Sequence, residues 1–106
     1  MSTEREQCWI ISTTEVDEMP PGVDMGILQQ RHHAYIEQLD SDGLLVAHGA
    51  ARDENGERFG PGFIVIRAAT RAQAEAVARR EPYILSGTRV LKLIPWQMQR
   101  ARGNKP

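Results

Sequence analysis

The sequence predicts a single domain with an α+β fold. Three observations indicate it: two stretches with helical periodicity, four short apolar segments typical of strands, and their order along the chain, strand, helix, strand, strand, helix, strand. A chain of 106 residues has the length of one domain. We assign residues 1–106 to it, with a core at residues 7–98 and a polar tail at residues 99–106.

The first strand is predicted at residues 7–14, which are rich in β-branched and aromatic side chains, and a loop with a Pro-Pro-Gly sequence follows at residues 15–23. Residues 24–43 have the periodicity of an amphipathic helix, with Asp24 as its N-cap and Gly43 just after its end. The apolar residues of this helix share one stripe: Leu28, Tyr35, Ile36 and Leu39.

The middle of the chain predicts a β-hairpin. Residues 44–52 form a short apolar strand, and residues 59–69 form the next one. The intervening turn, residues 53–56, ends in Asn55-Gly56, a strong short-range hairpin signal. The Gly-Pro-Gly sequence at residues 60–62 indicates either a bulge in the second of these strands or its late start.

A second helix and a last strand are predicted at residues 70–81 and 88–96. A Thr-x-x-Gln capping box opens the helix. Pro82 disfavours helical geometry at the residue before it, so we expect Glu81 to end the helix and residues 83–87 to form a turn.

This order of elements is the split β-α-β arrangement called ferredoxin-like, βαββαβ, in which two helices cover one face of a four-stranded antiparallel sheet. The last two predicted strands are apolar on both faces, and the helices can cover only one of them. We therefore expect a homodimer through the open sheet face, with the two sheets packed face to face.

Charge and composition exclude several classes of partner. The formal net charge is −1, so neither a nucleic acid nor an anionic membrane surface is an expected partner. No apolar run approaches the roughly 20 residues of a membrane span, and the charged N-terminus does not resemble a signal peptide. Cys8 is the single cysteine, which excludes an intramolecular disulfide and fits a cytoplasmic location.

Two polar residues, His32 and Glu81, interrupt the helix stripes that should face the sheet. In an antiparallel helix pair, the end of the second helix lies near the first half of the first helix. An imidazole and a carboxylate should therefore meet in a partly buried place, which is the arrangement that a general base requires. The alternative is a buried polar pair that only ties the two helices together.

Asp53 is a third candidate catalytic residue, and its alternative role is to form the hairpin turn. The candidate substrate-binding residues are Tyr35, His48 and Tyr83. No metal site is expected, because adjacent histidines on a helix diverge by about 100° and no Cys pair or His-x3-His spacing is present. The sequence has no dinucleotide or phosphate-loop motif, and no cofactor is expected.

A series of short motifs resembles the YciI-like (YCII-related domain) family over residues 7–98. They occur in the family's order: His32-His-Ala-Tyr-Ile-Glu-Gln-Leu39, Gly43-Leu-Leu45, Ala47-His-Gly49, Asp53, Gly60 to Ile66, Glu81-Pro-Tyr83, Gly87 and Ile94-Pro95-Trp96. The resemblance implies a dimeric α+β barrel and a His/Asp-centred site in a cleft. The spacing to Gly43 places the family histidine on His32 and not on His33, and the family carboxylates fall on Asp53 and Glu81.

The chain departs from the family pattern at three positions. His48 and Ala50 replace a small residue and a proline, and Glu81 replaces the usual Asp. Some members resemble or act as lyases or dehydrochlorinases on aromatic-pathway intermediates. We therefore expect a cofactor-free isomerisation or elimination of a small organic molecule, in which His32, oriented by Glu81 or Asp53, moves a proton. The alternative is a non-catalytic, small-molecule-binding or accessory homodimer.

Overall fold

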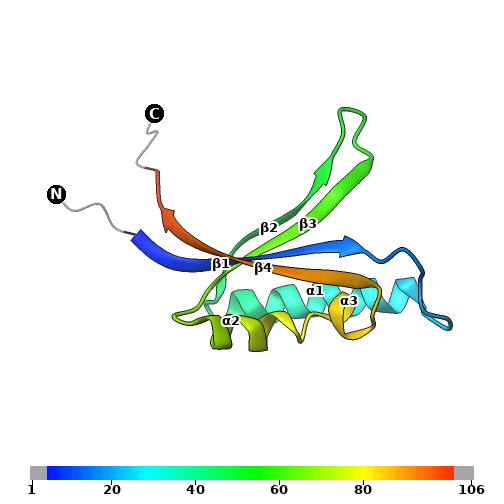
Figure 1. Ribbon diagram of the computed structural model, residues 1–106, viewed down its shortest axis with the longest axis horizontal. Helices are drawn as coiled ribbons and strands as arrows, with labels where there is room; N and C mark the ends of the chain where they lie inside the picture. Colours follow the sequence, from blue (N-terminus) through cyan, green and yellow to red (C-terminus); the bar gives the residue numbers. More distant parts are fainter. Residues whose placement is uncertain (1–4, 102–106) are drawn as a thin grey trace.

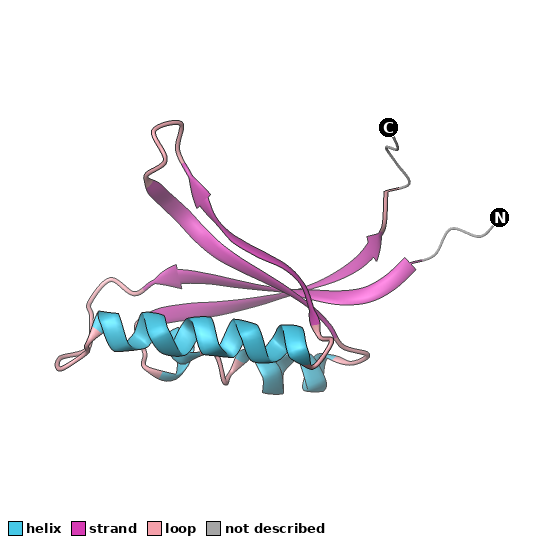
Figure 2. Ribbon diagram, turned by 180° about the vertical axis from the view of Figure 1, so that it is seen from behind, coloured by secondary structure: helices cyan, strands magenta, loops and turns pink. Residues whose placement is uncertain are grey.

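The computed structural model describes residues 5–101 and has the predicted α+β architecture (Figure 1). The elements are, in chain order, β1 (Arg5–Glu15), α1 (Met25–Ser41), β2 (Leu45–Arg52), β3 (Arg58–Arg67), α2 (Arg71–Ala78), α3 (Pro82–Leu85) and β4 (Arg89–Gln99). The strands form one antiparallel sheet in the order β2-β3-β1-β4. All helices lie on one face of it (Figure 2), so the prediction of a ferredoxin-like fold is confirmed.

The core lies between the sheet and the helices. Ile11 and Ile66 are completely buried at its centre, and each contributes roughly 1.5–3 kcal/mol by leaving water. Both belong to strands with period-two alternation, so every second side chain of these strands faces the helices. The other members of the cluster come from both layers: Trp9, Ile36, Leu39, Ile64, Ala74 and Ala78.

Both long helices begin at the predicted caps. Asp24 accepts a hydrogen bond from the backbone N–H of Ile27 at 3.1 Å, and Thr70 accepts one from Gln73 at 3.2 Å. Gly43 follows the end of α1 with a φ of 75°, a conformation that favours glycine over other residues. These local signals start and stop α1 within two residues of the predicted bounds.

The end of the second helix differs from the prediction. We expected it to continue to Glu81, but α2 ends at Ala78, and the expected turn contains the short helix α3. Pro82 explains the break, because it forces Glu81 into an extended conformation and then occupies the first position of α3. Glu81 thereby becomes the N-cap of α3.

The β2–β3 hairpin contains a bulge, one of the two alternatives predicted for residues 60–62. Ala50 pairs with Gly62, and Arg52 pairs with Arg58, so β3 uses two more residues than β2 between these pairs. Gly60 takes up this excess with a φ of 84°. The hairpin bends away from β1 and β4, and its tip points away from the helix layer (Figure 1).

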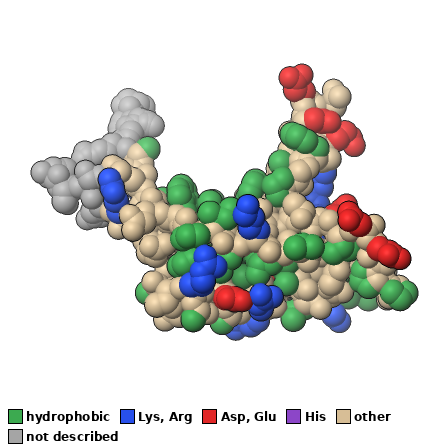
Figure 3. Space-filling view, viewed as in Figure 1, with side chains coloured by type: hydrophobic (Ala, Val, Ile, Leu, Met, Phe, Trp, Pro, Cys, Tyr) green, Lys and Arg blue, Asp and Glu red, His purple; other side chains and the backbone are tan. Residues whose placement is uncertain are grey.

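The sheet face opposite the helices carries exposed apolar side chains, among them Phe63, Val90 and Trp96. Strand alternation places Ile10 and Ile94, which pair with each other, on the same face. Hydrophobic side chains gather on this side of the molecule, between the hairpin and the outer ends of β1 and β4 (Figure 3).

The chain ends extend the sheet beyond the predicted core. The strand β4 continues to Gln99, the first residue of the predicted polar tail, while residues 102–106 of that tail lie outside the described part of the chain.

No helix within residues 5–101 has the length and apolar character needed to cross a membrane.

Candidate functional site

His32 lies in the third turn of α1, on the stripe that faces the sheet. Leu28 and Ile36, one turn before and one turn after it, are buried. The His32 side chain itself is 22% exposed, because it lies where the helix passes the bent hairpin and the sheet does not cover it completely. The His32 side chain is therefore packed among its helix neighbours and still accessible to a small solute.

Glu81 is the partner of His32. Its side chain is 1% exposed, and Oε1 lies 2.9 Å from Nδ1 of His32. A carboxylate can only accept hydrogen bonds, so Nδ1–H donates to it, and in the neutral imidazole Nε2 keeps its lone pair. The same oxygen accepts the backbone N–H of Tyr83 at 3.3 Å, which fixes the carboxylate at the start of α3. This arrangement leaves one imidazole nitrogen free to take up a proton.

Tyr83 lies between His32 and an arginine. Its ring centroid is 5.0 Å from that of His32, and the guanidinium carbon of Arg89 is 5.2 Å from the same centroid. The second contact has the geometry of a cation–π interaction. Pro82 starts α3 directly before Tyr83 and thereby fixes the backbone from which this ring projects.

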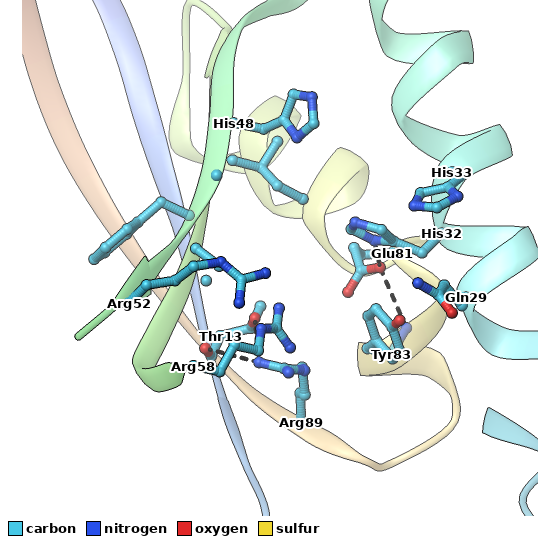
Figure 4. Close-up of a pocket in the computed structure, with 15 residues that line it drawn as sticks. Thr13, Gln29, His32, His33, His48, Arg52, Arg58, Glu81, Tyr83 and Arg89 are labelled. Carbon is cyan, nitrogen blue, oxygen red and sulfur yellow. Dashed lines mark hydrogen bonds and ion pairs between the residues drawn. The ribbon is translucent and has the colours of Figure 1, made fainter. Parts of the chain in front are cut away.

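These residues line an open cleft of about 390 Å³, a volume suited to a small organic molecule (Figure 4). One wall comes from α1 and α3 and the other from the sheet and the hairpin. The residues that line it are Thr13, Gln29, His32, His33, His48, Gly49, Ala50, Arg52, Arg58, Gly62, Phe63, Ile64, Glu81, Tyr83 and Arg89. Four predicted site residues are therefore brought together: His32, Glu81, His48 and Tyr83.

Asp53 is not brought into the cleft. Its Oδ1 accepts the backbone N–H groups of Asn55 and Glu57, each at 2.9 Å, and the residue is exposed in the hairpin turn. This is the turn-forming role that the sequence left open as an alternative. The bulged hairpin carries this turn away from α1, so His32 has Glu81 as its carboxylate partner and not Asp53.

Tyr35 does not line the cleft either, although it was expected to bind substrate. It lies three residues after His32, and its hydroxyl donates to the carbonyl of Val77 at 2.9 Å. Burial raises the pKa of Tyr35 far above its usual value, and the negative charge of Glu81 adds to this effect. Tyr35 thus ties α1 to α2 as a neutral phenol.

Sequence reasoning missed three arginines of the cleft, Arg52, Arg58 and Arg89 (Figure 4). Strand alternation could have indicated two of them, because residues two apart in a strand face the same side of the sheet. Arg52 lies two residues after Ala50 and four after His48, and Arg89 lies two residues before the core-facing Leu91. No comparable signal existed for Arg58, whose position depends on the bulge.

Three histidines and Glu81 line the cleft, but they do not form a metal site within the described part of the chain. Within residues 5–101, no group of three or more His, Cys, Asp or Glu side chains is arranged to hold a metal ion. Cys8 is buried in β1 outside the cleft, and its burial raises the pKa of the thiol. The ionisable groups that line the cleft are imidazoles, a carboxylate, a phenol and guanidinium groups.

Comparison with known proteins assigns the chain to a family. The YCII-related domain matches residues 25–97, which include both His32 and Glu81. The chain belongs to the YCII-related domain family. No functionally curated protein matches the sequence.

This YCII-related domain is similar in structure to 5-chloro-2-hydroxyhydroquinone dehydrochlorinase from Burkholderia phenoliruptrix AC1100, solved in complex with 2,5-dihydroxybenzoquinone. The two chains are 17% identical, the TM-score is 0.56, and the similarity covers 84% of this chain and 92% of the dehydrochlorinase. At this level of identity the two proteins share a fold.

Proposed function

We propose that this protein is a cofactor-free isomerase or lyase that acts on a small organic molecule, with His32 as its general acid and base. The contact between Nδ1 of His32 and the buried carboxylate of Glu81 carries this proposal. A buried carboxylate that orients a partly exposed imidazole favours proton transfer at the free nitrogen. The fold shared with a dehydrochlorinase supports the same reaction class.

In an elimination, Nε2 of His32 takes a proton from carbon, the electron pair of the broken C–H bond forms a double bond, and the leaving group departs with its own electron pair. In an isomerisation, the imidazolium returns the proton to a different carbon. Both reactions are balanced without an oxidant or a metal, and in both Glu81 stabilises the transient positive charge on the imidazolium.

Solvent-deuterium exchange tests this function. The wild-type protein is incubated in D₂O with chlorinated hydroxyhydroquinones and with small enolisable acids, and NMR follows deuterium uptake at carbon, product formation and chloride release. We expect exchange or turnover with at least one class and its loss in His32→Gln. A compound that binds in the cleft but undergoes neither exchange nor turnover would instead support the alternative, a non-catalytic binding or accessory domain.

We also propose that the protein is a cytoplasmic homodimer that buries the open sheet face. Phe63, Val90 and Trp96 make this face apolar across several strands, and a second copy of the sheet is complementary to it. The cytoplasmic location is proposed because a single cysteine fits a reducing compartment.

Sedimentation velocity at micromolar concentration tests the dimer. We expect a dimer for the wild type and a monomer for Val90→Asp, which places a charge on the open face. Leu85→Asp is the matched control, because Leu85 is exposed on α3, away from the sheet. A wild-type monomer at this concentration would contradict the proposal.

A further inference from the structure

We infer that the cleft takes an organic carboxylate, whose negatively charged group is held by Arg52, Arg58 and Arg89 while the reacting carbon faces His32. This inference rests on the proposed function and specifies its substrate class. The three guanidinium groups gather on the side of the cleft opposite His32 and Glu81 (Figure 4).

The pairing of Arg52 with Arg58 is the first observation. The two residues face each other across the antiparallel β2–β3 ladder. Like charges in this position destabilise a sheet unless something neutralises them. Within residues 5–101, no carboxylate forms an ion pair with either arginine; the Arg52 guanidinium donates to the carbonyl of Gly56 at 2.8 Å.

The burial of Arg89 is the second observation. Its side chain is only 7% exposed, yet its contacts with protein oxygens are long, at 3.4 and 3.5 Å to Thr13 and 4.0 Å to the exposed Glu15. A guanidinium has five N–H donors and is always charged. Both hydrogen bonds of Arg89 within residues 5–101 are long and come from the same nitrogen, Nη1, so the guanidinium has further donors for a ligand.

The local balance of charge agrees with an anionic ligand. Among residues 5–101, Glu81 is the only carboxylate that lines the cleft, and it already accepts from His32. The acidic residues of the hairpin turn, Asp53, Glu54 and Glu57, are exposed and do not line the cleft. The cleft is therefore positively charged, although the whole chain has a formal net charge of −1.

The spacing favours a small, flat acid. The ring centroid of His32 and the guanidinium carbon of Arg89 each lie about 5 Å from the ring centroid of Tyr83. The His32 ring and the Arg89 guanidinium are therefore separated by at most about twice that distance. The Tyr83 ring provides an apolar surface between them. A planar six-membered ring or a short unsaturated chain can contact this ring with its carboxylate at the arginines and its far end at His32. The planar fork of arginine matches a carboxylate with two parallel hydrogen bonds.

A binding titration followed by NMR at low ionic strength tests the inference. The probes are benzoate, its neutral analogue benzamide, acetate and inorganic phosphate. The variants are R52Q/R58Q, which removes two exposed charges of the cleft, and R79Q as the matched control, because Arg79 pairs with Glu75 outside the cleft.

We expect benzoate to bind wild type about tenfold more tightly than benzamide, and R52Q/R58Q to weaken benzoate binding by about tenfold or more. R79Q should bind benzoate within about twofold of wild type. Three results would overturn the inference: equal binding of benzoate and benzamide, benzoate binding that is unchanged in R52Q/R58Q, or no binding of either carboxylate. Tighter binding of phosphate than of benzoate would assign the arginines to phosphate and also overturn it.

His32→Gln separates this inference from the proposed function. If both hold, H32Q binds benzoate like the wild type but has no proton-transfer activity. If wild type binds benzoate through the arginines but turns over no compound, the carboxylate site is supported and the catalytic function is contradicted. If wild type turns over neutral compounds only, the catalytic function is supported and the carboxylate site is contradicted.

Discussion

His32 and Glu81 are 49 residues apart in the chain, and their side chains meet at 2.9 Å. One comes from the middle of a long helix and the other from the break between two helices. The break makes the pair possible, because an extended residue at the N-cap of α3 directs its carboxylate back toward its own helix and toward α1. The four predictions that follow concern this pair and its surroundings.

Replacing His32 with alanine should abolish turnover and leave the fold intact. Loss of a general base lowers rates by about 10²–10⁴-fold. The change also leaves the buried Glu81 carboxylate without one of its two hydrogen-bond donors, so we expect the free energy of unfolding to fall by about 1–3 kcal/mol. Steady-state kinetics and thermal unfolding measure the two effects. Gln30→Ala is the control, because Gln30 is exposed on α1 and does not line the cleft; H32A activity equal to that of Q30A would contradict the catalytic role.

Two replacements of Glu81 should distinguish the effect of its charge on turnover from the effect of its hydrogen bonds on stability. Glu81→Gln keeps an oxygen acceptor for His32 and Tyr83, so we expect nearly normal stability with reduced turnover. Glu81→Ala leaves both donors without this acceptor, and the free energy of unfolding should fall by about 1–3 kcal/mol. Chemical denaturation measures the difference. The control is Glu75→Ala, which breaks an exposed i,i+4 pair with Arg79 and should cost about 0.5 kcal/mol or less. Equal stability of E81A and E75A would contradict the structural importance of the buried carboxylate.

Asp53 should matter for the hairpin turn and not for turnover. In Asp53→Ala, two backbone N–H groups lose their acceptor, and we expect a loss of about 1 kcal/mol in stability. Asp53→Asn keeps one oxygen at this position and should restore most of the loss. Both variants should retain wild-type kcat/KM, because the side chain lies outside the cleft. A fully folded D53N protein without activity would contradict this prediction and support a catalytic role for Asp53.

Tyr35 should make the fold sensitive to high pH. Burial raises the pKa of Tyr35 in the folded protein above the usual value of about 10, so the unfolded chain loses this proton first as pH rises. The unfolded state then binds fewer protons than the folded state, and the free energy of unfolding decreases above pH of about 10. Tyr35→Phe removes this contribution.

Denaturation at several pH values between 7 and 11 measures the effect. The Y35F protein should be about 1 kcal/mol less stable than wild type at pH 7, because it lacks the hydrogen bond to Val77. Its stability should then decrease less steeply above pH of about 10. Tyr83 is present in both proteins, so its contribution cancels in the comparison. Parallel pH curves for the two proteins would contradict this prediction.

Much of the fold was predictable because its signals are local. The stripe from Leu28 to Leu39, the caps at Asp24 and Thr70, and the Asn55-Gly56 turn each depend on neighbours within a few residues. The break before Pro82 was predicted three residues too late, since the sequence shows that a helix cannot pass a proline but not how many turns it completes before it. The short helix α3 was missed for the same reason.

The candidate site was predictable only in part. His32 and Glu81 stood out as polar residues on apolar stripes, and the order of the helices was enough to bring them together. Asp53 and Tyr35 also had suitable side chains for the cleft. They lie elsewhere because of contacts that no spacing reveals, namely the backbone N–H groups of the hairpin turn and the carbonyl of Val77.

The sequence by itself determined where strands and helices form and which histidine lies on the sheet-facing stripe, because hydrophobic periodicity and capping operate over a few residues. Only the tertiary structure decided which charged groups share the cleft. Arg52, Arg58 and Arg89 come together through the bulge at Gly60 and the pairing of distant strands. Such contacts depend on how the sheet bends and not on any local pattern, so His32 and Glu81 acquire their arginine-lined cleft only when the whole sheet has formed.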